Sequence, residues 1–341
     1  MKKVLSLAIA AALVAPVAAV ADATIYGKVR QSLDIVSDER ISGADEVDNI
    51  QINNRTSRLG VKGSEDLGNG LTAVYKIEYG VNISTNPGGD EFSGDGSLGA
   101  RNAFVGLAGD FGTIVLGRHD TPLKISTGSL DYFGDTVVDN NTSYTESLVD
   151  RRADGTLAYI SPNLNGVTLA AAVIPGENSE ADGLADAYSL AAMYSNAGIF
   201  ASLAYEGADG NIDALPVNAA GQDRGDLDQF RAGFGYDGGM FKVGVVFENV
   251  TIENEAGGDD LRDSDSVMVN GAIKAGPGMV ALKIFDYADD SDDTNDHDGF
   301  GIGYHYGLSK RTQVMANYVD SSFDNLAGDV SILSLQVNHN F

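Results

Sequence analysis

The last nine residues of the chain alternate between apolar and polar side chains, and this pattern constrains the fold more than any other stretch. The odd positions are mainly apolar and the even positions polar: Leu333, Leu335, Val337 and Phe341 against Ser334, Gln336, Asn338 and Asn340. Because side chains alternate across a strand, the segment predicts a strand with one apolar and one polar face. Terminal segments usually fray unless a sheet holds them. We therefore expect a closed sheet with its apolar face in lipid and its polar face toward a wet interior.

The first 21 residues have the layout of a secretory signal peptide. Lys2 and Lys3 form a short basic region, residues 4–20 are an apolar run, and Ala19-Val20-Ala21 is a small-residue cleavage site. This order is typical of an exported chain and predicts a mature protein of residues 22–341. The apolar run is short for a membrane anchor, and no basic flank follows it.

Charge and residue usage exclude several classes of protein. The chain has 22 basic and 49 acidic residues, a net charge of −27, and loss of Lys2 and Lys3 leaves 20 minus 49, or −29. Nucleic acid is not an expected partner, because phosphate binding requires clustered Lys and Arg. No mature stretch reaches the ~18 consecutive apolar residues of a membrane helix, so only a barrel could span a bilayer. Cys is absent, which excludes disulfides, thiolate nucleophiles and Cys-based metal sites.

Segments with period-two alternation recur along the mature chain and predict strands, with connections between them that are by turns short and long. The short connections carry Gly, Asn or Pro, as tight hairpins require. Seven are found, at 66–70, 109–112, 161–166, 195–198, 237–239, 275–278 and 306–309. The long connections are irregular and mostly acidic. Eight are found, near 37–49, 84–98, 119–153, 175–185, 207–227, 252–263, 289–297 and 321–328.

Seven short turns and eight long loops join sixteen strands, with both termini on the side of the short turns. Outer-membrane barrels have even strand numbers, short periplasmic turns and longer outer loops. The pattern therefore predicts an all-β fold, a sixteen-stranded antiparallel transmembrane β-barrel over residues 22–341. Segments 112–118 and 154–161 are short against the ~9–11 residues that a tilted spanning strand needs.

Several segments together resemble the Gram-negative general porins, the trimeric sixteen-stranded type of the outer membrane. They are Ile25-Tyr26-Gly27-Lys28, residues 57–71, 101–107 and 111–118, Arg152 with residues 159–163, and the C-terminal Phe341. The resemblance is dense in the first half of the chain, and the later loops match nothing specific. It implies an outer-membrane homotrimer, in contact with lipid and lipopolysaccharide, whose water-filled channels pass ions and small hydrophilic solutes by passive diffusion.

In that family the third long loop folds into the barrel and narrows it, which the resemblance assigns here to residues 120–149. A loop of this length in a compact protein is usually functional or disordered. Residue by residue, the resemblance places pore-wall bases at Lys28, Arg58, Arg101 and Arg152, with Arg118 as a weaker match at a strand–loop junction, and loop acids at Asp131 and Asp135. It also makes Phe341 the assembly signal.

Parity supports an inward direction for two of these bases independently of the family. Arg58 alternates with Leu59 and shares its parity with Lys62, and Lys28 shares its parity with Asp34. The polar face of a barrel strand points to the lumen, because Arg or Lys facing lipid at the midplane costs ~2–4 kcal/mol. Opposed charges across a narrow aqueous slot order its water and favour polar solutes. Because acids outnumber these bases, we expect a modest cation preference that weakens as salt rises.

A substrate-specific outer-membrane channel, for a sugar or another small solute, is the closest alternative. Such channels guide sugars along aromatic side chains, and this chain has no Trp. A barrel with a blocked lumen is a further alternative, but no segment resembles a plug domain.

An enzyme is not expected. The motifs of hydrolases, zinc proteases and nucleotide-binding loops are absent. His119-Asp120 beside Ser126 or Ser129 is the one conceivable hydrolase constellation, and it defines a distant alternative, an outer-membrane hydrolase. No cofactor is expected. The acidic segment 289–298 lacks the order of an EF-hand and leaves open only weak Ca²⁺ or Mg²⁺ bridging to lipopolysaccharide.

Overall fold

The computed structural model describes residues 23–40, 47–84, 98–140, 148–176, 183–210, 225–254, 258–324 and 328–341. The predicted signal peptide, residues 1–21, lies outside them. The described chain is almost entirely strand: β1 (Thr24–Asp38), β2 (Val47–Asn54), β3 (Arg58–Gly68), β4 (Leu71–Val81), β5 (Leu98–Gly109), β6 (Gly112–Asp120), β7 (Arg152–Ile160), β8 (Val167–Ile174), β9 (Ala187–Asn196), β10 (Ile199–Ala208), β11 (Leu227–Asp237), β12 (Phe241–Ile252), β13 (Arg262–Ala275), β14 (Gly278–Asp289), β15 (His297–Gly307), β16 (Thr312–Phe323) and β17 (Val330–Asn340). In these ranges the helical turns are α1 (Pro122–Thr127) and the 3₁₀ turn η1 (Asp293–Asn295). None of the described helices is long and apolar enough to cross a membrane.

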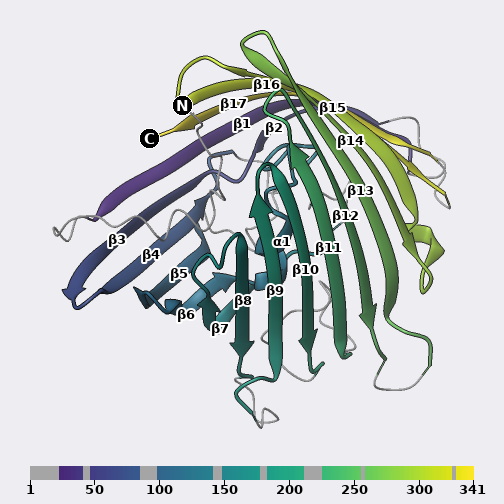
Figure 1. The fold of residues 1–341 in the computed structure, drawn as a ribbon. Coiled ribbons are helices and arrows are strands. Elements are labelled where there is room, and N and C mark those ends of the chain that lie inside the picture. Colours follow the sequence, from purple (N-terminus) through teal and green to yellow (C-terminus); the bar gives the residue numbers. More distant parts are fainter. Residues whose placement is uncertain are drawn as a thin grey trace.

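The strands form one antiparallel sheet in sequence order that closes where β1 pairs with β17 (Figure 1). One barrel strand is broken in two. The first residues of β1, Thr24–Lys28, pair with β3, and its later residues, Gln31–Asp38, pair with β2. Residues 55–57 separate the two halves, so seventeen segments make a sixteen-stranded barrel. The predicted fold class and strand number are confirmed.

The alternation predicted for the terminal strand is confirmed in β17. Leu333, Leu335 and Val337 are 42 to 53% exposed on the outer surface, whereas Ser334 and Gln336 are buried on the inner face. This inverts the usual soluble arrangement, because the outer face of a membrane barrel meets hydrocarbon and its interior is polar.

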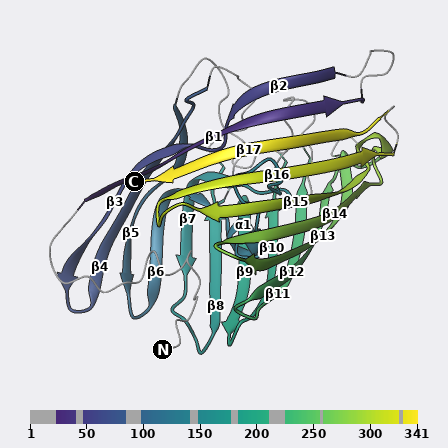
Figure 2. The same cartoon turned by 90° about the horizontal axis from the view of Figure 1, so that it is seen from above.

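The described strands are joined at one end by short turns and at the other by long loops, as the sequence predicts (Figure 2). In the β3–β4 turn, Asn69 and Gly70 both have positive φ, 55° and 77°, which is the conformation of a tight two-residue hairpin. The two segments that look short in the sequence, β6 and β7, are each nine residues long and can span the hydrocarbon layer.

The described parts of the long connection between β6 and β7, residues 121–140 and 148–151, fold inside the barrel, where α1 lies against the inner wall (Figures 1 and 2). Thr121 caps α1 by accepting a hydrogen bond from the Lys124 amide. Leu123 then packs against small residues of β8, β9 and β10. Further along the loop, Phe133 and Val138 are fully buried against β13, β14 and β16. Much of the buried apolar surface therefore lies between the loop and the wall.

The seam between the first and last strands is closed by a contact of Phe341 with Gly27. The two residues exchange backbone hydrogen bonds of 3.0 and 3.1 Å. The Phe341 ring also lies over Gly27, where an added Cβ would come within 2.3 Å of its Cζ atom. Only glycine leaves room for the ring at this point of the seam.

Candidate pore constriction

The tip of the β6–β7 loop reaches the wall formed by β1 and β3. The carboxylate of Asp135 lies 2.6 Å from Arg58 Nη2, is also paired with Arg30, and accepts a hydrogen bond from the Thr56 hydroxyl. Asp135 has a φ of 62°, and its own amide donates to the carboxylate of Asp139. The sequence leads us to expect Asp135 to face the bases across a slot, but it contacts them directly.

The same loop is held by three strands on the other side of the closing seam. Asn270 donates to the Leu130 carbonyl at 3.0 Å, and Lys283 donates to the Val138 carbonyl at 3.1 Å. Gln336 donates to the Asp135 carbonyl at 3.0 Å. These donors satisfy loop carbonyls that water would otherwise have to reach.

The end of the loop is fixed by a buried charged network on β11 and β12. Arg231 is fully buried and lies 2.5 Å from Glu248 and 2.6 Å from Asp150. Its Nη2 donates to the Val149 carbonyl, and Glu248 accepts the Val149 amide. Gln229 donates to both Val149 and Glu248. A charge buried this deeply requires such complete pairing.

We call the group of inward-facing bases opposite this network the basic wall. It consists of Lys28, Arg30, Arg55, Arg58 and Arg101 on β1, β3, β5 and the β2–β3 break. Lys28 lies opposite Arg58 in the β1–β3 register. Arg55 pairs with Asp34 and donates to Ser32 at 2.9 Å. The sequence-based set therefore missed Arg30 and Arg55.

Arg101 reaches the interior because of a β-bulge. It shares its parity with Val105 and Leu107, which point outward, so a regular strand would place it in lipid. Between Ile77 and Tyr79 the register of β4 and β5 shifts by one residue. The extra residue turns Arg101 inward, where its Nε donates to Glu78 at 2.8 Å. Glu78 was not predicted.

Arg152 lies at the base of the loop, away from the tip. Its Nη2 is 2.9 Å from Asp120, and its Nε donates to Asn102 at 2.6 Å. Lys124 approaches the same carboxylate at 3.5 Å. Arg152 is thus inside the barrel, but the structure does not bring it together with the basic wall.

Arg118 does not face the lumen. It lies on the same side of β6 as Ile114 and Leu116, both exposed on the outer surface, and it pairs with exposed Asp154 at 2.5 Å. The register of β6 with β7 is also irregular here. The expectation of a pore-wall role for Arg118 is therefore wrong: its parity is that of the lipid-facing residues, and a long base near a strand end can reach the interface.

Asp131 lies in the interior without reaching the basic wall. Its carboxylate accepts the amide of Phe133 at 2.8 Å, within the loop. Burial and the carboxylate of Asp139 raise the pKa of Asp131 to about 7, and the charge of Lys283 opposes this rise. Asp131 is therefore protonated more easily than an exposed aspartate.

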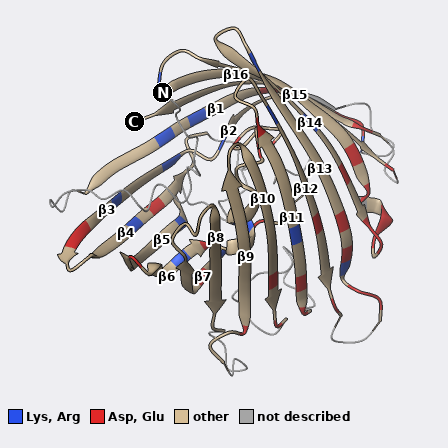
Figure 3. Cartoon of the chain, in the orientation of Figure 1, with Lys and Arg blue, Asp and Glu red and all other residues tan. Residues whose placement is uncertain are grey.

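The charges of the described residues are unevenly distributed. Figure 3 shows Lys and Arg on β1 and its neighbours, whereas Asp and Glu gather at the long-loop ends of β13 to β15, around η1. An ion entering from the loop side would first meet acidic groups and then the basic wall.

The hydrolase constellation is not assembled. His119 Nδ1 lies 2.7 Å from the Asp120 carbonyl and its ring packs against Phe104. The Ser126 hydroxyl is buried and donates to the Leu123 carbonyl at 2.7 Å, within α1. Within the ranges that the structure describes, no group of three or more His, Cys, Asp or Glu side chains could hold a metal ion.

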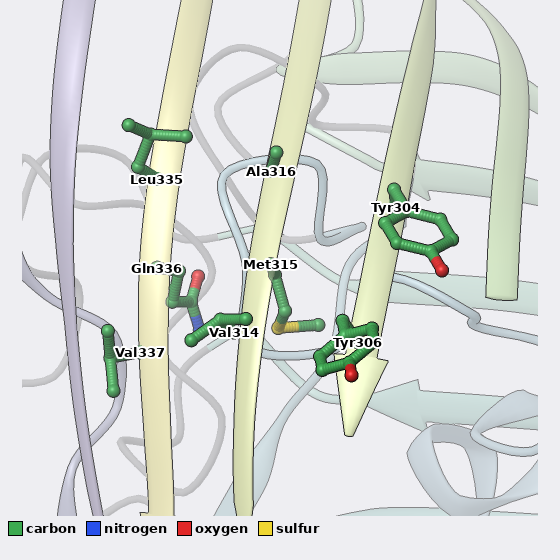
Figure 4. Close-up of a pocket in the computed structure, with 8 residues that line it drawn as sticks. All are labelled: Tyr304, Tyr306, Val314, Met315, Ala316, Leu335, Gln336 and Val337. Atoms are coloured by element: carbon green, nitrogen blue, oxygen red, sulfur yellow. The ribbon is translucent and has the colours of Figure 1, made fainter. Parts of the chain in front are cut away.

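A hollow of about 450 Å³ lies outside the pore, on the outer surface of β15, β16 and β17. Figure 4 shows small Ala316 between Leu335 and Tyr304, which leaves the space open. Leu335 and Val337 are about half exposed there, so the hollow faces the membrane. It takes no part in the path of a solute.

Comparisons with known proteins agree with this architecture. A family model for Gram-negative porins matches residues 6–326. The major outer membrane protein P.IB of Neisseria gonorrhoeae is 27% identical over 332 residues, 89% of each chain. Among solved structures, the anion-selective porin from Comamonas acidovorans has a TM-score of 0.77 and 22% identity, covering 94% of this chain and 100% of that one. The trimer form of OmpT from Vibrio cholerae has a TM-score of 0.66 and 17% identity, covering 94% and 99%. The two structural matches show the same fold.

Proposed function

We propose a place for the constriction in this protein, which belongs to the Gram-negative porin family and is an outer-membrane diffusion channel. Its passage narrows between the β6–β7 loop and the basic wall. The pairing of loop residue Asp135 with Arg58 and Arg30 carries this proposal. Solutes would pass beside this contact, between charged and amide side chains. Such a passage admits small polar molecules, which replace lost water contacts with contacts to the wall. We expect no catalysis.

The direction of the wall can be tested by cysteine modification, because the natural chain has no Cys. We expect a charged thiol reagent to reduce the current through Lys28→Cys channels. The matched control is Val29→Cys. Val29 is the next residue along β1, and its side chain is exposed on the outer surface. Reagent sensitivity of Val29→Cys together with insensitivity of Lys28→Cys would reverse the assigned faces of β1.

Ion preference is proposed to depend on salt concentration. The chain carries −27, and acids around η1 make the mouth negative. At the constriction, by contrast, the five bases of the basic wall outnumber their carboxylate partners Asp34, Glu78 and Asp135. The Debye length falls from ~30 Å at 0.01 M to ~3 Å at 1 M salt, so the mouth acts at a distance only in dilute salt.

We therefore expect modest cation preference at low salt that weakens and turns toward anions as salt rises. Reversal potentials across KCl gradients measure this directly. Cation preference that grows with salt would contradict the proposal, because it would require net negative charge at the constriction. The Comamonas porin, which has the same fold, is named as anion-selective, so anion preference occurs in this fold.

A homotrimer is the proposed assembly, in outer-membrane lipid with lipopolysaccharide as neighbour. The solved trimer form of OmpT, which shares the fold, supports it. Insertion events in planar bilayers should add three equal conductance levels, and chemical cross-linking in detergent should stop at three chains. Single levels with no cross-linked species would indicate a monomer.

A further inference from the structure

A second charged region lies on the inner wall at the end of the barrel with the short turns. It is a hollow of about 250 Å³ between β1, β17 and the β15–β16 turn. Its lining includes Arg30, Lys310, Arg311, Asn338 and Asn340. The short turns of outer-membrane barrels face the periplasm, so the hollow opens toward the periplasmic mouth.

The lining of this hollow is basic in a strongly acidic protein. It includes Arg30, Lys310 and Arg311 and no Asp or Glu, although the chain as a whole carries −27. The amides of Asn338 and Asn340 add neutral hydrogen-bonding groups. The backbone holds the turn in place, because the Asn340 amide donates to the Arg311 carbonyl at 2.8 Å.

Arg30 connects this hollow to the constriction. It is 9% exposed, and its Nε is buried with no hydrogen-bond partner among the described residues. Its Nη1 is paired with Asp135, but that one carboxylate also serves Arg58. Two guanidinium groups thus share the Asp135 carboxylate, and the Nε of Arg30 is an unused donor beside the hollow.

We propose that this hollow binds a small oxyanion with two negative charges, of which inorganic phosphate is the simplest. Arg presents donors in a planar fork that matches oxyanions, and Lys adds a point charge. The volume is below the ~300–1,000 Å³ of sites for drug-sized ligands and suits a small ion with some of its waters. The bound anion neutralises the bases of the periplasmic mouth and competes with Asp135 for Arg30.

The test is current through single channels in planar bilayers, in fixed KCl at mildly alkaline pH, with inorganic phosphate added to one side. For the natural protein we expect a saturable decrease of current and a shift of the reversal potential toward cations. The effect should be stronger when phosphate is added on the short-turn side, because from the other side it must first cross the constriction.

The double variant Lys310→Gln/Arg311→Gln should weaken the apparent affinity for phosphate about tenfold or more, as loss of charge-assisted hydrogen bonds requires. Lys274→Gln is the matched control: it removes one base from the β13–β14 turn, outside the lining, and should leave the affinity unchanged. Conductance in KCl alone shows that each variant forms a channel, which separates this proposal from the diffusion function. Equal phosphate responses in the natural protein and the double variant, or no saturable response in either, would overturn the site.

Discussion

The carboxylate of Asp135 and the guanidinium of Arg58, 77 residues apart in the chain, meet at 2.6 Å inside the barrel. Arg30 shares the same carboxylate from β1. The loop tip is therefore bound to the wall that it faces. On the proposed function, the width of the passage depends on this contact, and we expect changes to the contact to be measurable as conductance.

Asp135→Asn should widen the channel. The substitution removes the one negative charge that Arg30 and Arg58 share, so the two bases repel each other and the loop tip loses its attachment. Breaking a buried pair by removing one partner costs up to ~3–5 kcal/mol. We expect higher single-channel conductance and a reversal potential shifted toward anions. Asp110→Asn, which removes an exposed acid from the β5–β6 turn, should change neither by a comparable amount.

Stability should depend on the ionisation of Asp131. Its raised pKa means that the folded state binds more protons than the unfolded state between pH ~4 and about 7. The contribution of this group to the free energy of unfolding is therefore fully present at low pH, falls through that window, and is lost above it. Urea unfolding in detergent, followed by far-UV circular dichroism, should show the natural protein losing stability relative to Asp131→Asn between pH ~4 and about 7. Parallel profiles for the two proteins would refute the shift.

Gly27→Val should weaken the closing seam. The new side chain would meet the Phe341 ring at 2.3 Å and the Arg58 carbonyl at 2.9 Å, so either the ring or the strand must move. Overpacking of this kind costs ~1–3 kcal/mol. We expect a lower temperature of barrel unfolding by circular dichroism, with partial recovery in the double variant Gly27→Val/Phe341→Ala. The control is Gly271→Val on β13, where an added Cβ meets only one atom, at 4.0 Å.

Arg231→Met should destabilise the fold and release the end of the loop. It leaves Glu248 buried without its base and removes a donor to the Val149 carbonyl. We expect a loss of ~3–5 kcal/mol in the free energy of unfolding and an increase of conductance noise. Removing the acid as well, in Arg231→Met/Glu248→Leu, should recover part of the loss.

The exposed pair of Arg118 with Asp154 is the matched comparison for this buried network. Exposed ion pairs contribute ~0–1 kcal/mol, so Arg118→Met should be nearly neutral. A large loss there would mean that our placement of Arg118 on the outer surface is incorrect.

The alternation of apolar and polar residues was sufficient to predict the barrel. Each strand has one face toward lipid and one toward the polar interior, so its side chains change character with a period of two residues. The same rule predicts the inner position of Lys28 and Arg58. It also applies to Arg30 and to Arg231, which share their parity with buried neighbours and could have been found. Neither residue lies in the segments that resemble the family.

Other features depend on contacts that the alternation of apolar and polar residues does not predict. The bulge that turns Arg101 inward shifts the register by one residue, and no turn residue marks it in the sequence. The break of the second strand at residues 55–57 likewise has no apolar–polar signature. The pairing of Asp150 with Arg231 joins residues 81 apart and depends on where the whole loop lies.

Because the β6–β7 loop is bound to β1 and β3 at Asp135, to β11 and β12 at Val149, and to β13 and β14 at Leu130 and Val138, it connects opposite sides of the tube. A hollow cylinder in a bilayer is under lateral pressure and flattens most easily where nothing crosses it. The loop is thus a mechanical cross-brace, and we expect its bonds to affect the roundness of the barrel as well as the size of its opening.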